Sequence, residues 1–220
     1  MNLVFDLGAV LIAWEPTRLV QAHLAQHAPT EAAAVALGRA LFHHDDWTSF
    51  DCGTRTLDDA IARMAARLSL PADRLHAMLG NLGERLEAIE VTVDMLEQLF
   101  AHREAGQPLR LYYLSNMPAP YARALERRHA FMRRFDGGVF SGDVKFIKPD
   151  REIFELLAVR HALDPATTVF IDDSAPNVEA ARAFGWQAIH CTAPDMLPAQ
   201  LARYLPVSTT LSASKPRLRA

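Results

Sequence analysis

Polar side chains follow three short apolar runs of the sequence, at the point where each run ends: Asp6 after NLVF, Ser115 and Asn116 after LRLYYL, and Asp172 and Asp173 after TVFI. Adjacent carboxylates beside an apolar strand repel each other unless a cation relieves them. A lysine, Lys148, lies before Pro149 in a loop that leads into a helix. These residue types predict an acidic site that attracts a cation.

Taken singly, each cluster has an ordinary structural explanation. A lone aspartate at a strand end is usually a turn or helix-capping residue, a Ser-Asn pair is commonly a cap or turn, and a Lys-Pro pair is a solvated loop. In an open parallel sheet, however, ligands bind beyond the carboxyl ends of the strands. The four segments therefore converge if their strands are neighbours, and this convergence favours a functional site.

The elements that must position these residues alternate along most of the chain. We expect strands at Asn2–Asp6, Leu109–Leu114, Gly138–Phe140, Thr168–Ile171 and Gln187–Cys191. Between the later strands, helical patterns cover Val91–Glu104, Ala119–Arg128, Asp150–His161 and Ala175–Phe184. Strands that alternate with helices indicate right-handed βαβ units, so we predict an α/β, Rossmann-like three-layer core with a parallel sheet.

The segment after the first strand has a different pattern. Helices are expected at Thr17–Ala28, Thr30–Phe42, Thr56–Leu68 and Pro71–Leu79, with no convincing strand among them. We therefore predict a helical cap, residues 14–90, inserted after strand one into a core formed by residues 1–13 and 91–206. The tail, residues 207–220, is rich in Ser, Thr, Lys and Arg without apolar periodicity, and we expect it to be disordered.

Composition restricts the classes of function. The chain has 220 residues and a net charge of −3, which gives no electrostatic case for binding nucleic acid or an anionic membrane surface. Its two cysteines do not have the spacing of a metal site. The apolar start, Met1 to Trp14, is interrupted by Asp6 and lacks a basic segment before it, so we interpret it as a strand and not a signal peptide. We expect a cytoplasmic monomer or homodimer.

Four segments, in order, resemble the motifs of the haloacid dehalogenase-like hydrolase superfamily: VFDLGAVL, YLSNM, FIKPDREIF and FIDDSAPNVEAA. The start D-L-G-x-V is most similar to the subgroup that includes α-D-glucose-1-phosphate phosphatase and related sugar- and nucleotide-phosphate phosphatases. The resemblance implies a Mg²⁺-dependent phosphomonoester hydrolase that acts on a small phosphorylated metabolite.

The same resemblance implies a role for each motif residue. Asp6 would be the nucleophile and form an aspartyl-phosphate, which divides one hard displacement into two easier ones. Mg²⁺, which takes oxygen ligands, would be held by Asp6, the backbone carbonyl of Gly8 and Asp173, with Asp172 beside them. The phosphoryl group would be bound by Ser115, Asn116 and Lys148, while Asn177 would orient the acidic loop.

Two positions depart from the family pattern. Most phosphatases of the superfamily carry a second Asp, an acid and base for the leaving group, two residues after the nucleophile, where this chain has Gly8. General acid catalysis is worth about 10²- to 10⁴-fold, so the loss predicts a slow enzyme or a proton from water, substrate or cap. Ala9 stands where Asn or Gly is more usual.

Two alternative functions stay open. In a 2-haloacid dehalogenase the same aspartate attacks carbon without a metal, and an aromatic residue stands where this chain has Gly8. The D-L-G start and the pair Asp172 and Asp173 therefore favour a phosphate substrate over a halide. The second alternative is a non-catalytic protein that binds a phosphate ligand.

The cap offers fewer signals than the core. Residues near the hinge and the turn FDCGT, residues 50–54, face the active site in the family, so Trp14, Trp47 and Arg55 could line the pocket, although tryptophan is more often core. The stretch His43 to Asp46 is interpreted as a polar helix end and not a metal site, because adjacent histidines on a helix point about 100° apart.

Overall fold

The fold is built on a parallel sheet of five strands. A computed structural model describes residues 1–206, 209 and 211. The strands are β1 (Asn2–Phe5), β2 (Arg110–Ser115), β3 (Gly137–Phe140), β4 (Thr168–Asp172) and β5 (Gln187–His190), in the order β3-β2-β1-β4-β5. The predicted strands are confirmed to within a residue at each end, and β1 lies at the centre of the sheet.

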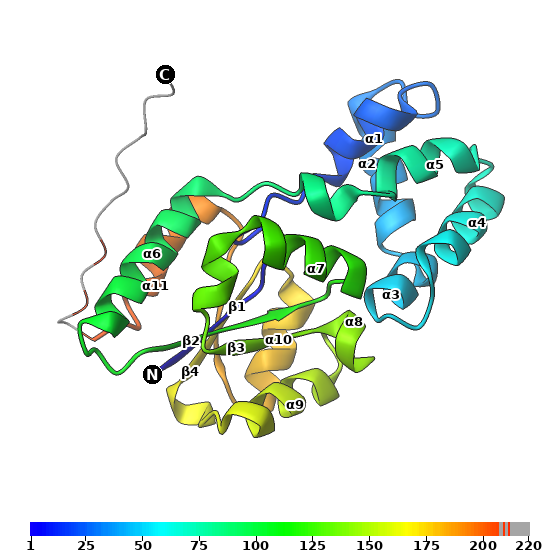
Figure 1. The fold of residues 1–220 in the computed structure, drawn as a ribbon. Helices are drawn as coiled ribbons and strands as arrows, with labels where there is room; N and C mark the ends of the chain where they lie inside the picture. Colours follow the sequence, from blue (N-terminus) through cyan, green and yellow to red (C-terminus); the bar gives the residue numbers. More distant parts are fainter. Residues whose placement is uncertain (207–208, 210, 212–220) are drawn as a thin grey trace, which may run out of the picture.

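Helices cover both faces of this sheet (Figure 1). One face packs against α6 (Glu90–Glu104), α7 (Ala119–Arg128) and α11 (Leu197–Leu201), and the other against α9 (Arg151–His161) and α10 (Ala175–Phe184). Successive strand residues point to opposite faces, so Leu3 and Phe5 join the first core cluster while Val4 joins the second. Burial on both faces explains why β1 is a continuous apolar run. The predicted α/β three-layer fold is confirmed.

The helical cap follows β1, as predicted. It contains α1 (Pro16–Leu24), α2 (Glu31–Phe42), α3 (Asp45–Asp51), α4 (Leu57–Leu68), α5 (Ala72–Leu79) and the 3₁₀ turn η1 (Leu82–Arg85). Figure 1 shows these helices beyond one end of the sheet. The chain leaves and returns side by side, because Ile12 forms bridges with Gly8 and Ala88. The boundaries of the cap at residues 14 and 90 remain a prediction.

One cap helix, α3, is absent from the predicted elements. It has seven residues, and its N-cap is His44, whose Nδ1 accepts a hydrogen bond from Asp46 N at 3.2 Å. A short helix without a Ser, Thr, Asp or Asn cap leaves a weak pattern in the sequence. His43 is the C-cap of α2, so the interpretation of this stretch as a polar helix end is confirmed. Helix α1 ends at Leu24, before the predicted Ala28.

The cap is fastened to the core at the short helix α8 (Ser141–Val144). Lys145 Nζ donates to the carbonyls of Gly53 at 2.5 Å and Gly142 at 2.9 Å. Gly53 has a φ of +70°, and a Cβ there would lie 2.4 Å from Gly142 O. Both the backbone conformation and the close approach therefore require glycine at this position.

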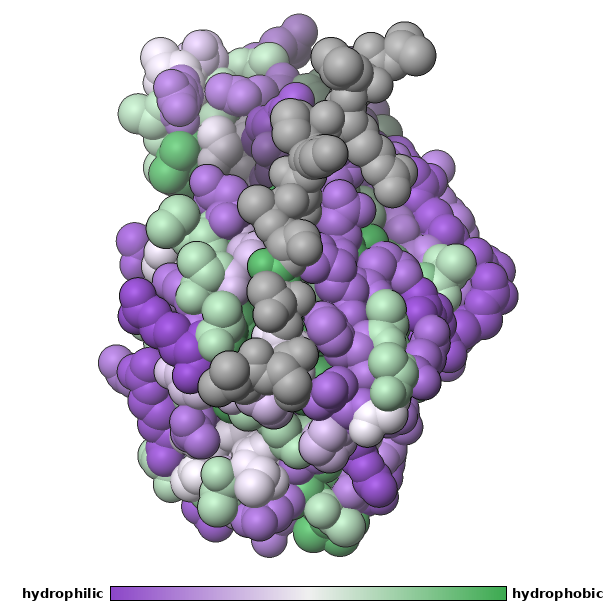
Figure 2. All heavy atoms as spheres, turned by 90° about the vertical axis from the view of Figure 1, so that its left-hand side faces the viewer, coloured by the Kyte–Doolittle hydropathy of each residue, from purple (hydrophilic) through white to green (hydrophobic). Residues whose placement is uncertain are grey.

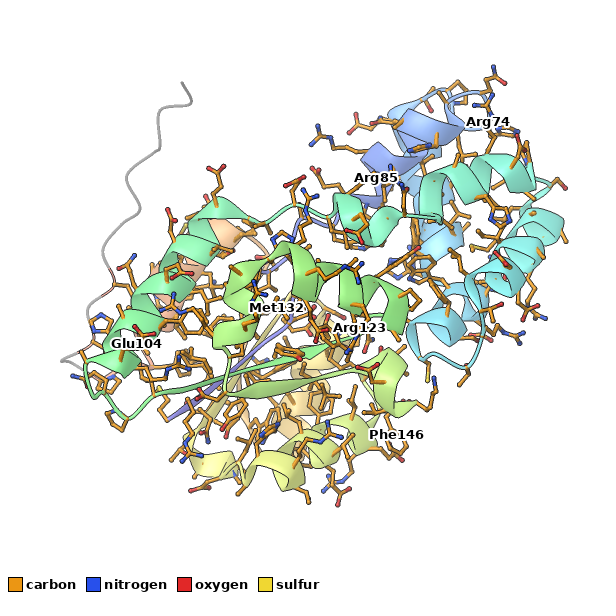
Figure 3. All side chains as sticks on the ribbon, viewed as in Figure 1. Arg74, Arg85, Glu104, Arg123, Met132 and Phe146 are labelled. Carbon is orange, nitrogen blue, oxygen red and sulfur yellow. The ribbon has the colours of Figure 1, made fainter. Side chains whose placement is uncertain are left out.

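A second set of contacts joins α7 to the returning segment of the cap. Arg127 pairs with Glu84, and the Tyr121 hydroxyl donates to Leu79 O at 2.5 Å. Figure 3 labels Arg85, which reaches from η1 to Met78 O in the cap, and Arg123, which pairs with Asp143 of α8 at 2.5 Å. The cap thus contacts the core at two elements, α8 and α7.

The surface gives little indication of a large apolar interface on the face that Figure 2 presents, where hydrophilic side chains predominate. Among the helices of the described residues, none is long and apolar enough to cross a membrane. The disorder predicted for residues 207–220 falls, apart from Thr209 and Leu211, outside the part of the chain that the structure describes.

Candidate active site

Three neighbouring strands bring the predicted polar clusters together. β1 pairs with β2 on one side and with β4 on the other. Asp6 directly follows β1, and its backbone N–H donates to Ile171 O at 2.8 Å, while Ser115 and Asp172 are the last residues of their strands. A pocket of about 220 Å³ opens here between sheet and cap. The convergence expected from the sequence is confirmed.

Lys148 lies between two buried carboxylates. Its Nζ is 2.9 Å from Asp6 Oδ1 and 2.6 Å from Asp172 Oδ2, and its side chain is only 1% exposed. Burial alone would lower the pKa of Lys148, but the charges of Asp172 and Asp6 outweigh it and raise that pKa above its usual value. Lys148 is therefore a fixed positive charge in the floor of the pocket.

The Asp6 carboxyl is buried among three other charged side chains, those of Lys148, Asp172 and Asp173. Burial, opposed by the positive charge of Lys148, raises the pKa of Asp6 to about 7. The negative charges of Asp172 and Asp173 also act to raise it. A single lysine thus does not offset the negative charge that gathers around Asp6, and a further cation would stabilise its ionised form.

Asp172 is held by several donors at once. Its Oδ1 accepts from Ser174 N at 2.8 Å and from Asn177 Nδ2 at 3.0 Å, and its Oδ2 accepts from Lys148 Nζ. The predicted orienting contact of Asn177 with the acidic loop is present. These bonds occupy much of the acceptor capacity of Asp172, which leaves Asp6 and Asp173 better placed to ligate a metal directly.

The donor set fits a hard divalent cation. Within the described part of the chain, Asp6, Asp172 and Asp173 form a group whose carboxylate oxygens lie within 4.8 Å of one another. Asp6 Oδ1 is buried and accepts no well-aligned hydrogen bond, although it is paired with the charge of Lys148. An unsatisfied buried oxygen among carboxylates suits Mg²⁺, which takes oxygen ligands.

The Asn116 side chain contacts the backbone of Lys148, while its predicted contact with a phosphoryl group stays a prediction. Its Nδ2 donates to Lys148 O at 2.9 Å, and its Oδ1 accepts from Lys148 N at 2.8 Å. The amide side chain therefore clamps the Lys148 loop against the end of β2, and these two bonds leave the backbone N–H of Asn116 unused. Ser115 is buried at the floor of the same pocket.

Both departures from the family pattern, Gly8 and Ala9, lie in the turn after Asp6. A Cβ on Gly8 would meet only Trp14 Cβ, at 3.9 Å, so the backbone does not require glycine at this position. Ala9 has a φ of +55°, in the left-handed region that Gly and Asn adopt more readily. The usual Asn or Gly at position 9 is thus a conformational preference, whereas the backbone does not impose the missing side chain at Gly8.

The cap supplies most of the remaining pocket wall. Trp14 and Trp47 line the pocket as predicted, but Arg55 is not among the lining residues and instead pairs with Asp59 at 2.9 Å. Trp47 stacks on Trp14 with a centroid distance of 6.1 Å and meets Phe42 edge-on at 4.8 Å. The apolar wall consists mainly of Trp14, Phe42, Trp47, Leu86, Met117 and Tyr121.

Asp51 is one of the polar pocket residues, with His43 and Ser174, that were not predicted from the sequence. It is the last residue of α3, it lines the pocket with Asp6, and its electrostatic partners include Asp6 and Lys148. The signal in the sequence was the turn FDCGT, which contains Asp51 and was expected to face the site. The turn alone does not say which of its side chains points inward.

The structure thus combines a parallel α/β fold, a buried aspartate after the central strand and a lysine between acidic residues, at the edge of the sheet where such folds bind ligands. The model of the haloacid dehalogenase-like hydrolase family matches residues 3–185. The chain belongs to this family, as its four motifs predicted. The glucose-1-phosphate phosphatase subgroup remains a prediction.

Known relatives cover most of the chain. A sesquiterpene phosphatase, astK of Aspergillus oryzae, is 28% identical over 86% of this chain and 88% of its own. A HAD family enzyme of Bacteroides thetaiotaomicron, solved with magnesium and inorganic phosphate, has a TM-score of 0.64 at 20% identity over 86% of this chain and 92% of its own. The L-2-haloacid dehalogenase of Xanthobacter autotrophicus has a TM-score of 0.60 at 19% identity, over 85% and 75%. Both structural likenesses concern the fold.

Proposed function

We propose that the protein hydrolyses a phosphomonoester through an aspartyl-phosphate on Asp6. The observation that carries this proposal is the Asp6–Lys148–Asp172 arrangement, with Nζ 2.9 Å and 2.6 Å from the two carboxylates, at the floor of a pocket. The phosphatase relative and the magnesium–phosphate complex of a protein with the same fold support it.

Each residue has a defined task in this mechanism. An oxygen of Asp6 attacks phosphorus in line with the ester oxygen, which leaves toward the cap as the P–O bond breaks. Lys148, the Ser115 hydroxyl and the Asn116 backbone N–H bind the equatorial oxygens, where negative charge is held throughout the transfer. Water then attacks the phosphoryl group on Asp6, which releases phosphate and restores the carboxylate.

Asp6, Asp173 and the Gly8 carbonyl are the proposed Mg²⁺ ligands, with Asp172 beside them as a carboxylate that also fixes Lys148. The ion supplies positive charge that offsets the repulsion between a carboxylate nucleophile and a phosphate dianion. Because three carboxylates gather around one lysine, the protein's own charges do not provide this compensation alone.

The pocket wall supports an apolar leaving group. The sequence predicted a sugar phosphate or nucleotide, but away from the phosphate end the polar side chains that line the pocket are mainly His43 and Asp51, beside aromatic and aliphatic ones. Sugar hydroxyls buried without hydrogen-bond partners lose free energy. We therefore propose the monophosphate of an apolar alcohol as substrate, and the sesquiterpene phosphatase relative supports the same class.

The experiment compares farnesyl monophosphate with glucose 1-phosphate and a nucleoside monophosphate, with Mg²⁺ and with EDTA. We expect Mg²⁺-dependent release of phosphate, fastest from the farnesyl ester, and a loss of at least about 10³-fold in Asp6→Asn, since it removes the nucleophile. Faster hydrolysis of the sugar ester would overturn the substrate class alone, and substantial activity in Asp6→Asn would overturn the mechanism.

The two alternative functions have their own signatures in the same assays. Release of chloride from 2-chloropropionate in EDTA would indicate a dehalogenase. Binding of phosphate without hydrolysis of even an activated aryl phosphate would indicate a non-catalytic protein. The acidic group of Asp6, Asp172 and Asp173 favours the phosphatase, because carbon attack needs no cation.

A further inference from the structure

The proposed reaction leaves one chemical requirement without a residue. Gly8 has no side chain two residues after Asp6, yet an alkoxide leaving group needs a proton when its bond to phosphorus breaks. Since Asp6 lies at the sheet side of the pocket and attack is in line, the leaving oxygen points away from Asp6, toward the cap. The proton donor should therefore be a cap side chain that lines the pocket.

Asp51 is the carboxyl that the cap brings to this place. It ends α3, lines the same pocket as Asp6 and Lys148, and interacts electrostatically with both. Among the described residues it lies outside the possible metal group of Asp6, Asp172 and Asp173. Asp51 thus belongs to the cap side of the pocket and not to the proposed metal site.

The backbone of Asp51 is fixed by the core. Its carbonyl accepts from Ser141 Oγ at 2.6 Å, and the same Ser141 Oγ accepts from Met117 N at 2.9 Å. Met117 follows the phosphate-binding residues Ser115 and Asn116 in the loop after β2. A chain of two hydrogen bonds therefore couples the position of Asp51 to the loop that would hold the phosphoryl group.

The environment of the side chain favours a protonated carboxyl. Burial holds the pKa of Asp51 well above its ordinary value, the hydrogen bond from Trp47 lowers it in part, and the charge of Asp6 raises it. A carboxyl that only anchors Trp47 would be equally buried. The two roles differ in how strongly kcat/KM depends on the leaving group of the ester.

We propose that Asp51 is the general acid and base of the phosphatase reaction, in the place left empty by Gly8. As Asp6 attacks and the P–O bond breaks, the Asp51 carboxyl transfers its proton to the departing ester oxygen, which gives a neutral alcohol. The resulting Asp51 carboxylate then takes a proton from the water that attacks the aspartyl-phosphate. Phosphate leaves, and both carboxyl groups return to their starting states. The inference rests on the proposed function.

The test is Asp51→Asn, assayed with esters whose leaving groups differ in their need for a proton. With farnesyl or another alkyl phosphate, we expect kcat/KM to fall about 10²- to 10⁴-fold, whereas 4-nitrophenyl phosphate, whose leaving group is stable as an anion, should lose less than about tenfold. Asp58→Asn, the same change at an exposed position of the cap, should leave both rates unchanged.

A rescue variant makes the assignment specific. Gly8 can accept a side chain, since its Cβ would meet only Trp14 at 3.9 Å. Gly8→Asp added to Asp51→Asn should therefore restore hydrolysis of the alkyl ester by at least about tenfold and change the aryl ester little. The rescue depends on a carboxyl near the leaving group, which a purely structural defect in the cap would not repair.

Three results would overturn the proposal alone, and a fourth would remove it together with the proposed function. Equal losses on alkyl and aryl esters in Asp51→Asn would mean a structural role, and unchanged alkyl hydrolysis would mean no role. If Asp51→Asn does not fold, kcat/KM of the wild-type protein is measured with esters of alcohols that differ in pKa. A steep fall in kcat/KM as the pKa of the leaving alcohol rises would show that no acid protonates the leaving group. Hydrolysis of neither ester by the wild type would remove the proposed function itself, and this inference with it.

Discussion

At the scale of single residues, the raised pKa of Asp6 makes metal binding depend on pH. A proton and Mg²⁺ compete for the same carboxylate, and burial raises its pKa to about 7 in the metal-free protein. Below that pH, Mg²⁺ must displace the proton. The apparent Mg²⁺ affinity should therefore rise with pH, by up to about tenfold per unit between pH 6 and 7, and level off above.

Calorimetric titration with Mg²⁺ at several pH values, in two buffers of different ionisation enthalpy, measures both the affinity and the protons released. Asp6→Asn serves as the control, since it cannot carry that proton and should show a flatter pH dependence. Equal affinities of the wild-type protein at pH 6 and pH 8 would contradict the assignment of Asp6 as a metal ligand.

The residues of the core site could be predicted from the sequence, while the cap residue could not. Asp6, Ser115 and Asp172 are fixed by where β1, β2 and β4 end, which the apolar runs mark. The contact of Asp51 with the site depends on how α3 docks on the core, and no local pattern records that docking. The clamp between Asn116 and Lys148 is likewise a contact between distant segments.

At the scale of elements, helix α9 ends in a residue with an unfavourable backbone conformation. Ala162 is its exposed C-cap, with a φ of +51°. Glycine adopts this left-handed conformation without the steric cost of a Cβ. Ala162→Gly should therefore raise the free energy of unfolding by about 1 kcal/mol and leave hydrolysis unchanged.

Ala158→Gly, within the same helix, is the matched control of opposite sign. It should lower the free energy of unfolding by about 1 kcal/mol, because glycine is the poorer helix former. Urea unfolding followed by circular dichroism measures both. A loss of stability in Ala162→Gly as large as that in Ala158→Gly would contradict the strain at position 162.

Helices with regular patterns and good caps were the predictable elements. α4 is capped by the Thr56 side chain, which accepts from Asp59 N at 3.2 Å, and both its start and its apolar face follow from the sequence. α3 lacks such a cap and depends on tertiary contacts, in which the buried Asp46 accepts from Arg63 at 2.9 Å and Arg67 at 2.8 Å. Ion pairs between separate helices leave no periodic signal.

At the scale of the whole molecule, Gly53 is the position where the cap backbone comes very close to the core. Alanine at this position would bring Cβ to 2.4 Å from Gly142 O, in a backbone region with a φ of +70°. Gly53→Ala should therefore push the cap from the core and raise KM by about tenfold or more, because the cap wall no longer encloses the substrate.

Gly106→Ala is the control that separates the strain of a positive φ from the loss of the contact between the cap and the core. Gly106 also has a positive φ, of +91°, but nothing lies within 4 Å of its Cβ position. Both variants should lose about 1 kcal/mol of stability from the backbone conformation, and only Gly53→Ala should also change KM. Thermal unfolding and steady-state kinetics give the two readouts, and identical KM values would show that this contact does not control closure.

The fold class was predictable at this scale because alternating strands and helices admit few arrangements. The order β3-β2-β1-β4-β5, with the apolar β1 at the centre, was not predicted, because several strand orders are compatible with right-handed connections. The fastening of the cap by Lys145 and Ser141 was not predictable, since single lysine and serine side chains near a loop are common on any surface.

The central place of β1 has a consequence for the order in which the molecule assembles. Its two neighbours begin at Arg110 and Thr168, so each arrives long after β1 has left the ribosome. The helices of residues 16–79 emerge before either neighbour exists, and their contacts are mostly local, which favours early folding. Asp6 is therefore synthesised before both of the strands that flank β1, and it gains its surroundings only when they have joined the sheet. A nascent chain halted before residue 168 would carry a folded cap and no active site.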